Sequence, residues 1–306
     1  MRAYIDEICR ELDFPPEAAD AMLEAWDAVA AEPETYRIWQ KRTAEYEKEN
    51  YAEEESGADA GHMNFKEALA DIDIAAQKAG IHKYTAQLLF FLCLTRHLKQ
   101  LYEARNLDLK IWHDSCMDLR WKLMECHNMY GIWGSFVAWW FAGFFELKLF
   151  VLGRLEFELI DFPESYEKAG RTKPEGMTKA INVHIPSCGK LEMADCHDSY
   201  RRAAAFFADA FPGRQAAFYC WSWMLFAPHK AFLNPDSGIV RFMDEYDIYR
   251  TGCDNGDLWR IFNAEYHGDA EKLSENTSLQ RGYKSWLKAG NSAGFGEGIF
   301  FLDKTK

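Results

Sequence analysis

The chain has 306 residues, of which 48% are hydrophobic and 15% aromatic, so it can bury a sizeable core and is not of the disordered class. Its formal net charge is −13 at pH 7 and no stripe of Lys and Arg stands out, which argues against a nucleic-acid partner because phosphate binding needs a basic face. Eight cysteines are scattered without a CxxC pair, and the charged first residues contain no apolar signal segment. These features are typical of free thiols in a reducing compartment, and we expect a cytoplasmic protein.

Residues 1–135 are predicted to form a helical domain. Pro15 and Pro16 suit a helix start, and apolar residues follow them at helical spacing. The same periodicity predicts further helices over residues 64–80, 81–105 and 111–128. The histidines of this region lack HExxH-type spacing, so no metal site is expected.

An uncharged, aromatic-rich segment, residues 129–145, follows these helices. It is shorter than the roughly 20 residues that a membrane-spanning helix needs, and glycines interrupt it. We therefore expect a buried helix at a domain junction and no membrane partner. Beyond it the pattern changes to mixed helix and strand, and we place a boundary between residues 135 and 136, with a second domain over 136–306.

Residues 149–160 alternate apolar and polar side chains and are predicted to form one strand. Gly153 indicates a bulge or a close backbone approach. Arg154 shares the polar face of that strand with two glutamates, which predicts a charge pair across the face. The segment 161–178 is interpreted as a hairpin connection, the alternative being a flap beside a substrate.

A strand, a turn, a helix and a second strand follow in order. Residues 180–185 alternate as a strand, Pro186 and Gly189 end it, and the apolar period lengthens to that of a helix over 193–211. Residues 215–225 alternate again. A strand–helix–strand unit implies a right-handed crossover with parallel pairing of its two strands.

The turn of this unit presents unpaired N–H groups and the positive end of the helix dipole, a place that can hold an anion, although most such turns bind nothing. His184, Cys220 and Ser222 lie near the carboxyl ends of the two strands, where open α/β sheets collect ligands, and we take them as the candidate catalytic residues. Cys220 is either a nucleophile with His184 as its base or an inert buried thiol.

The rest of the chain completes a mixed domain. A helix passing into a strand is predicted over 239–249, a helix over 278–288 and a final strand over 299–302. The predicted fold class is therefore α/β (α+β), with a helical N-terminal domain followed by a mixed sheet with flanking helices.

Five segments carry a family resemblance: VLGRLEFEL, NVHIPSCGKLEMADCHDSYRRAAAFFADAFP, CWSWML, SGIVRFMDEYDIY and TSLQRGYKSWLKAG. Their order and spacing resemble the GNAT-like C-terminal domain of a bacterial acyltransferase family, whose members carry a helical N-acyltransferase domain before it. The resemblance covers residues 133–302 and, more weakly, the part before. It implies a GNAT-like mixed sheet, an acyl-CoA cosubstrate (acetyl-CoA or longer) and a small-molecule amine acceptor, with no metal.

The resemblance also implies where the substrates lie. The pyrophosphate of the acyl-CoA would lie over the turn Cys188, Gly189, Lys190 and Leu191, where backbone N–H groups and the Lys190 ammonium are donors. The two parallel strands would splay apart, the pantetheine arm would enter between them, and the amine would attack the thioester directly. His184 is then the candidate base, with a hydrogen-bonded interior histidine as the alternative.

The chain departs from the family pattern at three places. Relatives tend to have Cys-His-Ser-Trp where this chain has Cys220-Trp221-Ser222-Trp223, so no role of that histidine carries over. Glu192 stands where a helix N-cap is usually Ser or Thr, and its carboxylate would repel a pyrophosphate. The R/Q-x-x-G-x-G/A turn of typical N-acetyltransferases is reduced to a single glycine.

Three classes of function stay open from the sequence. The first is an acyl-CoA-dependent N-acyltransferase, the second a noncatalytic GNAT-like binding module, and the third a Cys-dependent hydrolase or acyl carrier. The third class needs Cys220 beside His184, whereas the first needs only the base. Each class is compatible with an oligomer.

Overall fold

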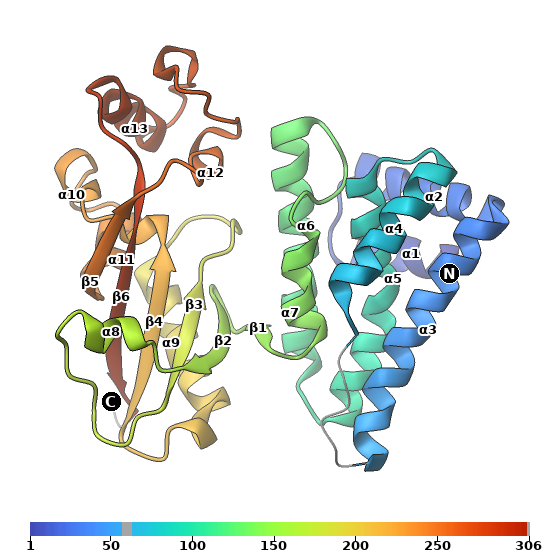
Figure 1. The fold of residues 1–306 in the computed structure, drawn as a ribbon, viewed down its shortest axis with the longest axis horizontal. Helices are drawn as coiled ribbons and strands as arrows, with labels where there is room; N and C mark the ends of the chain where they lie inside the picture. The colour runs from blue at the N-terminus through green and yellow to red at the C-terminus, as the bar shows by residue number, and fades with distance from the viewer. Residues whose placement is uncertain (57–62, 305–306) are drawn as a thin grey trace. The chain divides into compact units, whose positions relative to one another are not determined.

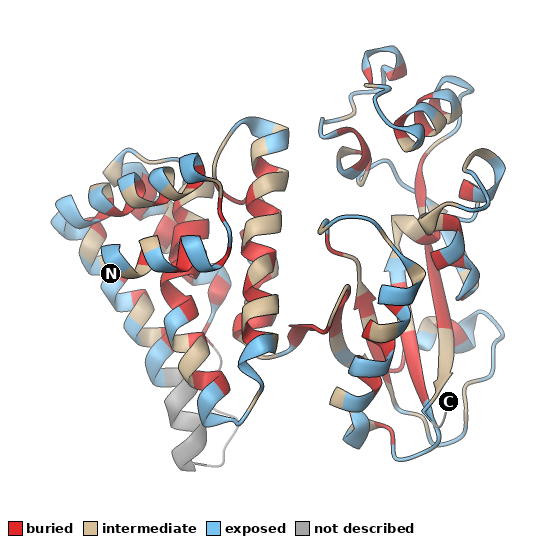
Figure 2. Ribbon diagram, turned by 180° about the vertical axis from the view of Figure 1, so that it is seen from behind, coloured by how far each residue is buried: buried red, intermediate tan, exposed pale blue. Residues whose placement is uncertain are grey.

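The computed structural model describes residues 1–56 and 63–304 (Figure 1). The chain divides into two compact units, Met1–Phe150 and Val151–Lys306. Each unit has its own buried core, and burial concentrates in the central helix of the first and in the middle strands of the second (Figure 2).

The first unit is a bundle of helices around α5. The helices are α1 (Arg2–Glu11), α2 (Pro16–Ala31), α3 (Pro33–Ser56), α4 (Phe65–Ala79), α5 (Lys83–Ala104) and α6 (Leu109–Tyr130). Every residue from Leu88 to Leu94 of α5 is fully buried, because neighbouring helices pack on all its sides. The helices predicted over 64–80, 81–105 and 111–128 are confirmed.

Local signals set the ends of these helices. Asn64 and Asp108 cap α4 and α6 by accepting hydrogen bonds from backbone N–H groups of the first turn. Gly80 and Gly131 end the same two helices in the left-handed conformation that favours glycine. The predicted starts and stops therefore follow from side chains within one turn of each end.

The aromatic-rich segment after α6 forms η1 (Ala138–Phe141) and α7 (Ala142–Phe145). It packs within the helical unit, where η1 contacts α4 and α5 and where Phe91 lies 5.2 Å from Phe141 and 4.9 Å from Phe145 between ring centroids. This packing places the division of the chain at residue 150, beyond the boundary expected at 135.

The sheet has six strands in the order β1-β2-β3-β4-β6-β5, and all of it except Leu149 and Phe150 of β1 belongs to the second unit. The strands are β1 (Leu149–Val151), β2 (Glu156–Asp161), β3 (Lys179–His184), β4 (Gln215–Ser222), β5 (Asp247–Cys253) and β6 (Gly294–Asp303). β3 and β4 are parallel, whereas the pairs β2–β3, β4–β6 and β5–β6 are antiparallel. The fold class predicted from the sequence, a helical N-terminal part followed by a mixed sheet with flanking helices, is confirmed.

Two helices cover opposite faces of the sheet. The crossover between the parallel strands is α9 (Met193–Phe206), and the connection from β2 to β3 carries the short α8 (Glu164–Lys168). Figures 1 and 2 show α8 on one face and α9 on the other. We call these the α8 face and the α9 face.

The α9 face holds the core of the second unit. Tyr200 of α9 packs its ring 5.1 Å from Phe218 of β4 and 4.8 Å from Phe300 of β6. The rings of Phe218 and Phe300 are stacked at 5.0 Å with 7° between their planes. These three side chains fix which positions of β4 and β6 point toward α9.

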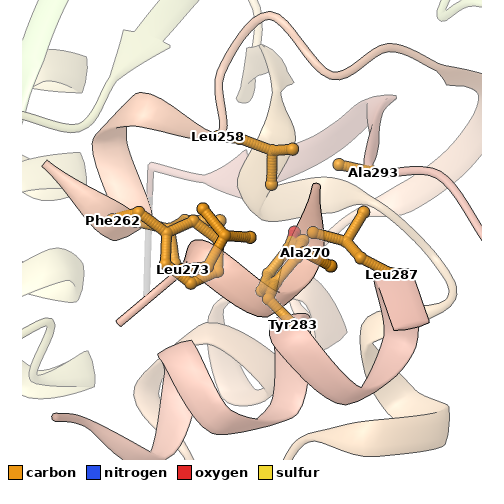
Figure 3. Packing of buried hydrophobic residues seen from close by; sticks show 8 residues of the cluster. Leu258, Phe262, Ala270, Leu273, Tyr283, Leu287 and Ala293 are labelled. Carbon is orange, nitrogen blue, oxygen red and sulfur yellow. The ribbon is translucent and has the colours of Figure 1, made fainter. Parts of the chain in front are cut away.

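The remaining short elements lie between α9 and β6 in the chain. They are η2 (Ala208–Ala210), η3 (Trp223–Leu225), α10 (His229–Phe232), α11 (Gly238–Asp244), α12 (Trp259–Phe262), η4 (Ala270–Lys272) and α13 (Ser278–Lys288). A satellite core between α12, η4 and α13 is built from Leu258, Phe262, Ala270, Leu273, Tyr283, Leu287 and Ala293 (Figure 3). The predicted helix over 278–288 and the helix-to-strand passage over 239–249 are confirmed.

Two strand predictions were wrong in extent. The single strand expected over 149–160 is broken by a turn between β1 and β2, because Gly153 adopts a φ of 92°. The last strand begins at Gly294 rather than at Ile299, since its glycines admit the crossing backbone of neighbouring segments.

At Gly296 the crossing backbone leaves no room for a side chain, so a substitution there is expected to destabilise the fold. A Cβ atom at this position would overlap the carbonyl oxygen of Leu225, where η3 passes over β6. Gly296→Ala is expected to lower the free energy of unfolding by about 1–3 kcal/mol through overpacking. Gly213→Ala, at a position with no heavy atom within 4 Å, is the matched control and is expected to leave the urea midpoint unchanged. Equal midpoints for both variants would contradict the crossing.

Candidate active site at the parallel strand pair

The parallel pair β3–β4 has a short ladder. In the described sheet its register consists of Ile181 with Phe218 and Asn182 with Tyr219. β3 is paired with β2 along its whole length, up to His184, and β4 is paired with β6 up to Ser222. Each strand is therefore held along its length by its other neighbour, whereas the register between β3 and β4 ends at Asn182 and Tyr219 in the described sheet. The parallel pairing predicted for this unit is confirmed.

The register also fixes which side chains share a face. Phe218 points toward α9, so alternation places Tyr219 and its partner Asn182 on the α8 face. Two residues further along each strand, His184 and Trp221 are the next side chains on that face. They stand at corresponding positions on β3 and β4. Trp221 is 59% exposed, which is unusual for an indole on a sheet.

His184 is part of a hydrogen-bonded group on β2 and β3. Its Nε2 lies 3.0 Å from Oε1 of Glu158, and the amide of Asn182 donates to the same carboxylate oxygen at 2.7 Å. Glu158 is directly opposite Asn182 in the antiparallel register, so the three side chains gather on the α8 face. The hydrogen bond with His184, and next to it that from Asn182, lowers the pKa of Glu158 although partial burial opposes the shift. Glu158 is thus an ionised partner for the imidazole.

This contact determines which ring nitrogen can take up a proton. When Nε2 carries hydrogen and donates to Glu158, the accepting lone pair of the neutral ring is on Nδ1. The arrangement suits a general base oriented by a neighbouring acid.

A second polar group lies on the α8 face of β4 and β6. The carboxylate of Glu297, 4% exposed, accepts hydrogen bonds from the hydroxyls of Ser165 at 2.7 Å and Tyr219 at 2.9 Å. Arg250 donates to its other oxygen at 3.0 Å, and the Tyr249 hydroxyl lies 3.0 Å from that of Ser165. Burial raises the pKa of Glu297, but the bonds from Ser165, Tyr219 and Arg250 outweigh it and lower the pKa overall. These hydrogen bonds connect α8, β4, β5 and β6 next to Tyr219, the last residue of β4 that is paired with β3.

The turn after β3 begins at the carboxyl end of this strand. Gly189 has a φ of 118° and no atom within 4 Å of the place a Cβ would take, so the turn is open on that side. Cys188 is partly buried, and the exposed Lys190 side chain forms no ion pair in the part of the chain that the structure describes. The carbonyl oxygen of Leu191 packs against Gly238 at the start of α11. Glu192 precedes α9 as its N-cap without a side-chain cap bond.

Arg154 is the residue that this region depends on, and its predicted role was wrong. Instead of pairing with Glu156 and Glu158 across a strand face, its guanidinium donates to the backbone carbonyls of the turn after β3. The turn at Gly153 removes Arg154 from the strand, so the alternation on which the charge pair rested does not reach it.

Cys220 and Ser222 do not join this group. Cys220 is fully buried on the α9 face, on the opposite side of the sheet from His184, and burial raises the pKa of its thiol. The hydroxyl of Ser222 accepts a hydrogen bond from the N–H of Met224 at 3.2 Å and so caps η3. The geometry therefore supplies no base for a cysteine nucleophile.

Sequence reasoning missed Glu158, Tyr219, Glu297 and the true contacts of Arg154. Tyr219 carried a usable signal, since it shares the strand face of Trp221 two residues away. Glu158 carried a weaker one, because only the hairpin register reveals that it lies opposite Asn182. Glu297 sits in a glycine-rich stretch that gave no indication of a buried carboxylate.

Comparison with known families decides the assignment. Residues 149–300 match the family model described as GNAT-like C-terminal domain, and residues 3–147 match the one described as N-acyltransferase N-terminal domain. The chain belongs to this acyltransferase family. The resemblance predicted from the sequence motifs is confirmed, including the order of the two domains.

Solved acyltransferases share the fold of this family member. One, in complex with decanoyl-CoA and teicoplanin, has a TM-score of 0.69 at 20% sequence identity, covering 97% of this chain and 87% of that chain. A variant in complex with octanoyl-CoA has a TM-score of 0.71 at 19% identity, with the same coverage of 97% and 87%. A third, in complex with CoA and 10C-Teicoplanin, has a TM-score of 0.70 at 19% identity, covering 96% of this chain and 86% of that chain. The comparison with curated proteins returned no match.

Neither a metal cluster nor a membrane-spanning helix is found in the described part of the chain. Within residues 1–56 and 63–304, no group of three or more His, Cys, Asp or Glu side chains is arranged to hold a metal ion. No helix in that same part of the chain has the length and apolar content needed to cross a membrane.

The lowered pKa of Glu297 predicts a pH dependence of stability. A carboxylate whose pKa in the folded chain lies below the unfolded value of about 4.3 stabilises fully above that value, and the contribution is lost as pH falls through the folded pKa. Glu297→Gln cannot titrate, so the difference in melting temperature between wild type and variant is expected to shrink below about pH 4. Calorimetry from pH 7 to pH 3 measures it. The exposed Glu175→Gln is the control, and a Glu297→Gln difference that stays constant with pH would contradict the prediction.

Proposed function

We propose that this protein transfers an acyl group from an acyl-CoA to an amine by direct attack of the amine on the thioester, in the opening between β3 and β4. The observation that carries the proposal is the ladder that stops at Asn182 and Tyr219 while both strands continue. Membership of an acyltransferase family gives the reaction class.

The inner strand edges provide a place for the pantetheine arm. An extended chain can add to a strand edge through main-chain hydrogen bonds, and the pantetheine arm contains two amides that can form them. At the carboxyl end of β3 the arm would reach the turn from Cys188 to Leu191, whose amides and Lys190 ammonium suit the pyrophosphate. The solved relatives with decanoyl-CoA, octanoyl-CoA or CoA bound support acyl-CoA as the cosubstrate.

The acceptor would approach from the α8 face. His184, oriented by Glu158, takes a proton from the amine as the new C–N bond forms, and the thioester C–S bond breaks with CoA thiolate leaving. Trp221, which lies on the same face of the sheet and is 59% exposed, would offer an apolar surface to the acceptor. The relatives in complex with teicoplanin and 10C-Teicoplanin support a small-molecule acceptor in this class of protein.

The other two classes receive less support. A Cys-dependent hydrolase needs Cys220 and His184 on one face of the sheet, and alternation puts them on opposite faces. A noncatalytic binding module would bind acyl-CoA without turnover, and it is the outcome that the following two experiments separate from the proposal.

His184→Ala is the test of the base. Loss of general base catalysis is expected to lower kcat by about 10²–10⁴-fold with little change in the KM for acyl-CoA. The assay incubates octanoyl-CoA with a panel of primary amines and follows the acylated product by mass spectrometry. His267→Ala, at a strongly exposed histidine, is the matched control, and Cys220→Ala is expected to keep activity. Unchanged kcat in His184→Ala would remove the base from the proposal.

Lys190→Ala is the test of the nucleotide turn. Removing an ammonium that pairs with the pyrophosphate is expected to raise the Kd for CoA roughly fivefold to tenfold, the size of one exposed charge-assisted hydrogen bond. Isothermal titration with CoA measures it, and Lys168→Ala, on the exposed side of α8, is the control. Equal affinity in wild type and Lys190→Ala would place the pyrophosphate elsewhere.

A further inference from the structure

One side chain holds the turn after β3 from a single side. The guanidinium of Arg154 donates from Nη1 to the carbonyl oxygen of Pro186 at 3.1 Å, from Nη2 to that of Gly189 at 2.8 Å and from Nε to that of Lys190 at 3.0 Å. The thiol of Cys188 lies 3.8 Å from the carbonyl oxygen of Arg154. Three carbonyls of one short turn therefore converge on one planar cation, which matches the rigid fork of donors that arginine presents.

Arg154 is itself anchored on α9. Its backbone N–H donates to Oγ of Ser199 at 2.7 Å, and that hydroxyl donates to the carbonyl oxygen of Asp195 one helical turn earlier. Gly153 makes the approach possible, since a Cβ there would lie 2.7 Å from the same hydroxyl oxygen. The buried Ser199 thus connects the crossover helix to the turn through Arg154.

The direction of the carbonyls determines the direction of the amides. In a trans peptide the N–H points to the opposite side from the C=O, and the described chain contains no cis peptide bond. Because the carbonyls of Gly189 and Lys190 point at Arg154, the N–H groups of Lys190 and Leu191 point away from it. These are amides of the turn proposed to receive the pyrophosphate.

The cation also changes the electrostatics of the turn. Carbonyl oxygens carry partial negative charge that would repel a phosphate, and Arg154 draws three of them to its own side. The amides left on the other side face outward with a full positive charge behind them. Both effects favour an anion and counteract the repulsion expected from Glu192.

We propose that Arg154 is a positioning residue for the pyrophosphate of acyl-CoA: it does not contact the nucleotide but orients the amides of Lys190 and Leu191 toward it. The inference rests on the proposed function for the identity of the anion. It concerns binding of the diphosphate alone, and it leaves the thioester, the acceptor and His184 untouched.

The experiment compares two acyl donors on the full-length protein. Octanoyl-CoA carries the diphosphate, whereas S-octanoyl-pantetheine has the same thioester arm and no phosphate. Arg154→Lys keeps the charge without the fork, and Arg154→Met removes both. In each variant the KM for octanoyl-CoA is expected to rise roughly tenfold, with kcat unchanged and the KM for S-octanoyl-pantetheine unchanged.

Two further variants complete the design. Ser199→Ala keeps the guanidinium but removes the anchor of Arg154, and it is expected to shift the KM for octanoyl-CoA in the same direction by a smaller factor. If the Arg154 variants fail to fold, the KM of Ser199→Ala for octanoyl-CoA is the test of the role of Arg154. Arg201→Met, at an exposed position of α9 that pairs with Asp198, is the matched control and is expected to change neither constant.

Failure of the inference and failure of the proposed function give different results. Equal rises of KM for both donors, or no rise for octanoyl-CoA, overturn the role of Arg154 while the transferase stands. A wild type that binds CoA but turns over neither donor overturns the proposed function, and the same comparison of Kd values for CoA and pantetheine then decides the role of Arg154. A wild type that binds CoA no more tightly than pantetheine overturns both.

Discussion

The second unit depends on how β3 and β4 divide their pairing between each other and their other neighbours, β2 and β6. Each strand is laddered along its outer edge, β3 to β2 and β4 to β6, and these ladders impose their own twist and direction. The two strands satisfy each other only at Ile181–Phe218 and Asn182–Tyr219 in the described sheet. This short pairing is the feature on which the proposed entry of the pantetheine arm rests.

The same register determines which side chains lie on each face of the sheet. It sets Asn182, His184, Tyr219 and Trp221 on the α8 face, and it turns Cys220 into the core on the other side. A slip of β4 by one residue would turn Cys220 to the α8 face and Trp221 to the α9 face, so strand register keeps the Cys220 thiol apart from His184. The buried carboxylate of Glu297 reinforces the arrangement by linking α8 to three strands.

Local signals in the sequence predicted much of the fold and less of the site. The change of apolar period from 180–185 to 193–211 located β3 and α9, and the glycines and caps of the helical unit located its helix ends. The contacts of Arg154 were not predictable in this way, since they join it to residues more than thirty positions away through a turn that Gly153 creates. Glu158 and Glu297 likewise meet their partners through pairing between distant strands, which no local period encodes.

The state of the cysteines has a consequence for chemical labelling. Six of them, Cys9, Cys93, Cys116, Cys126, Cys196 and Cys220, are buried, and burial raises the pKa of each thiol. Cys253 is exposed and Cys188 is partly buried, so an aqueous alkylating reagent reaches these two in preference to the rest. In a Cys253→Ser variant, Cys188 would be the preferred site of alkylation, and it lies in the turn between β3 and α9. A fluorophore attached there would report occupancy of the turn directly, without any need to know the acceptor.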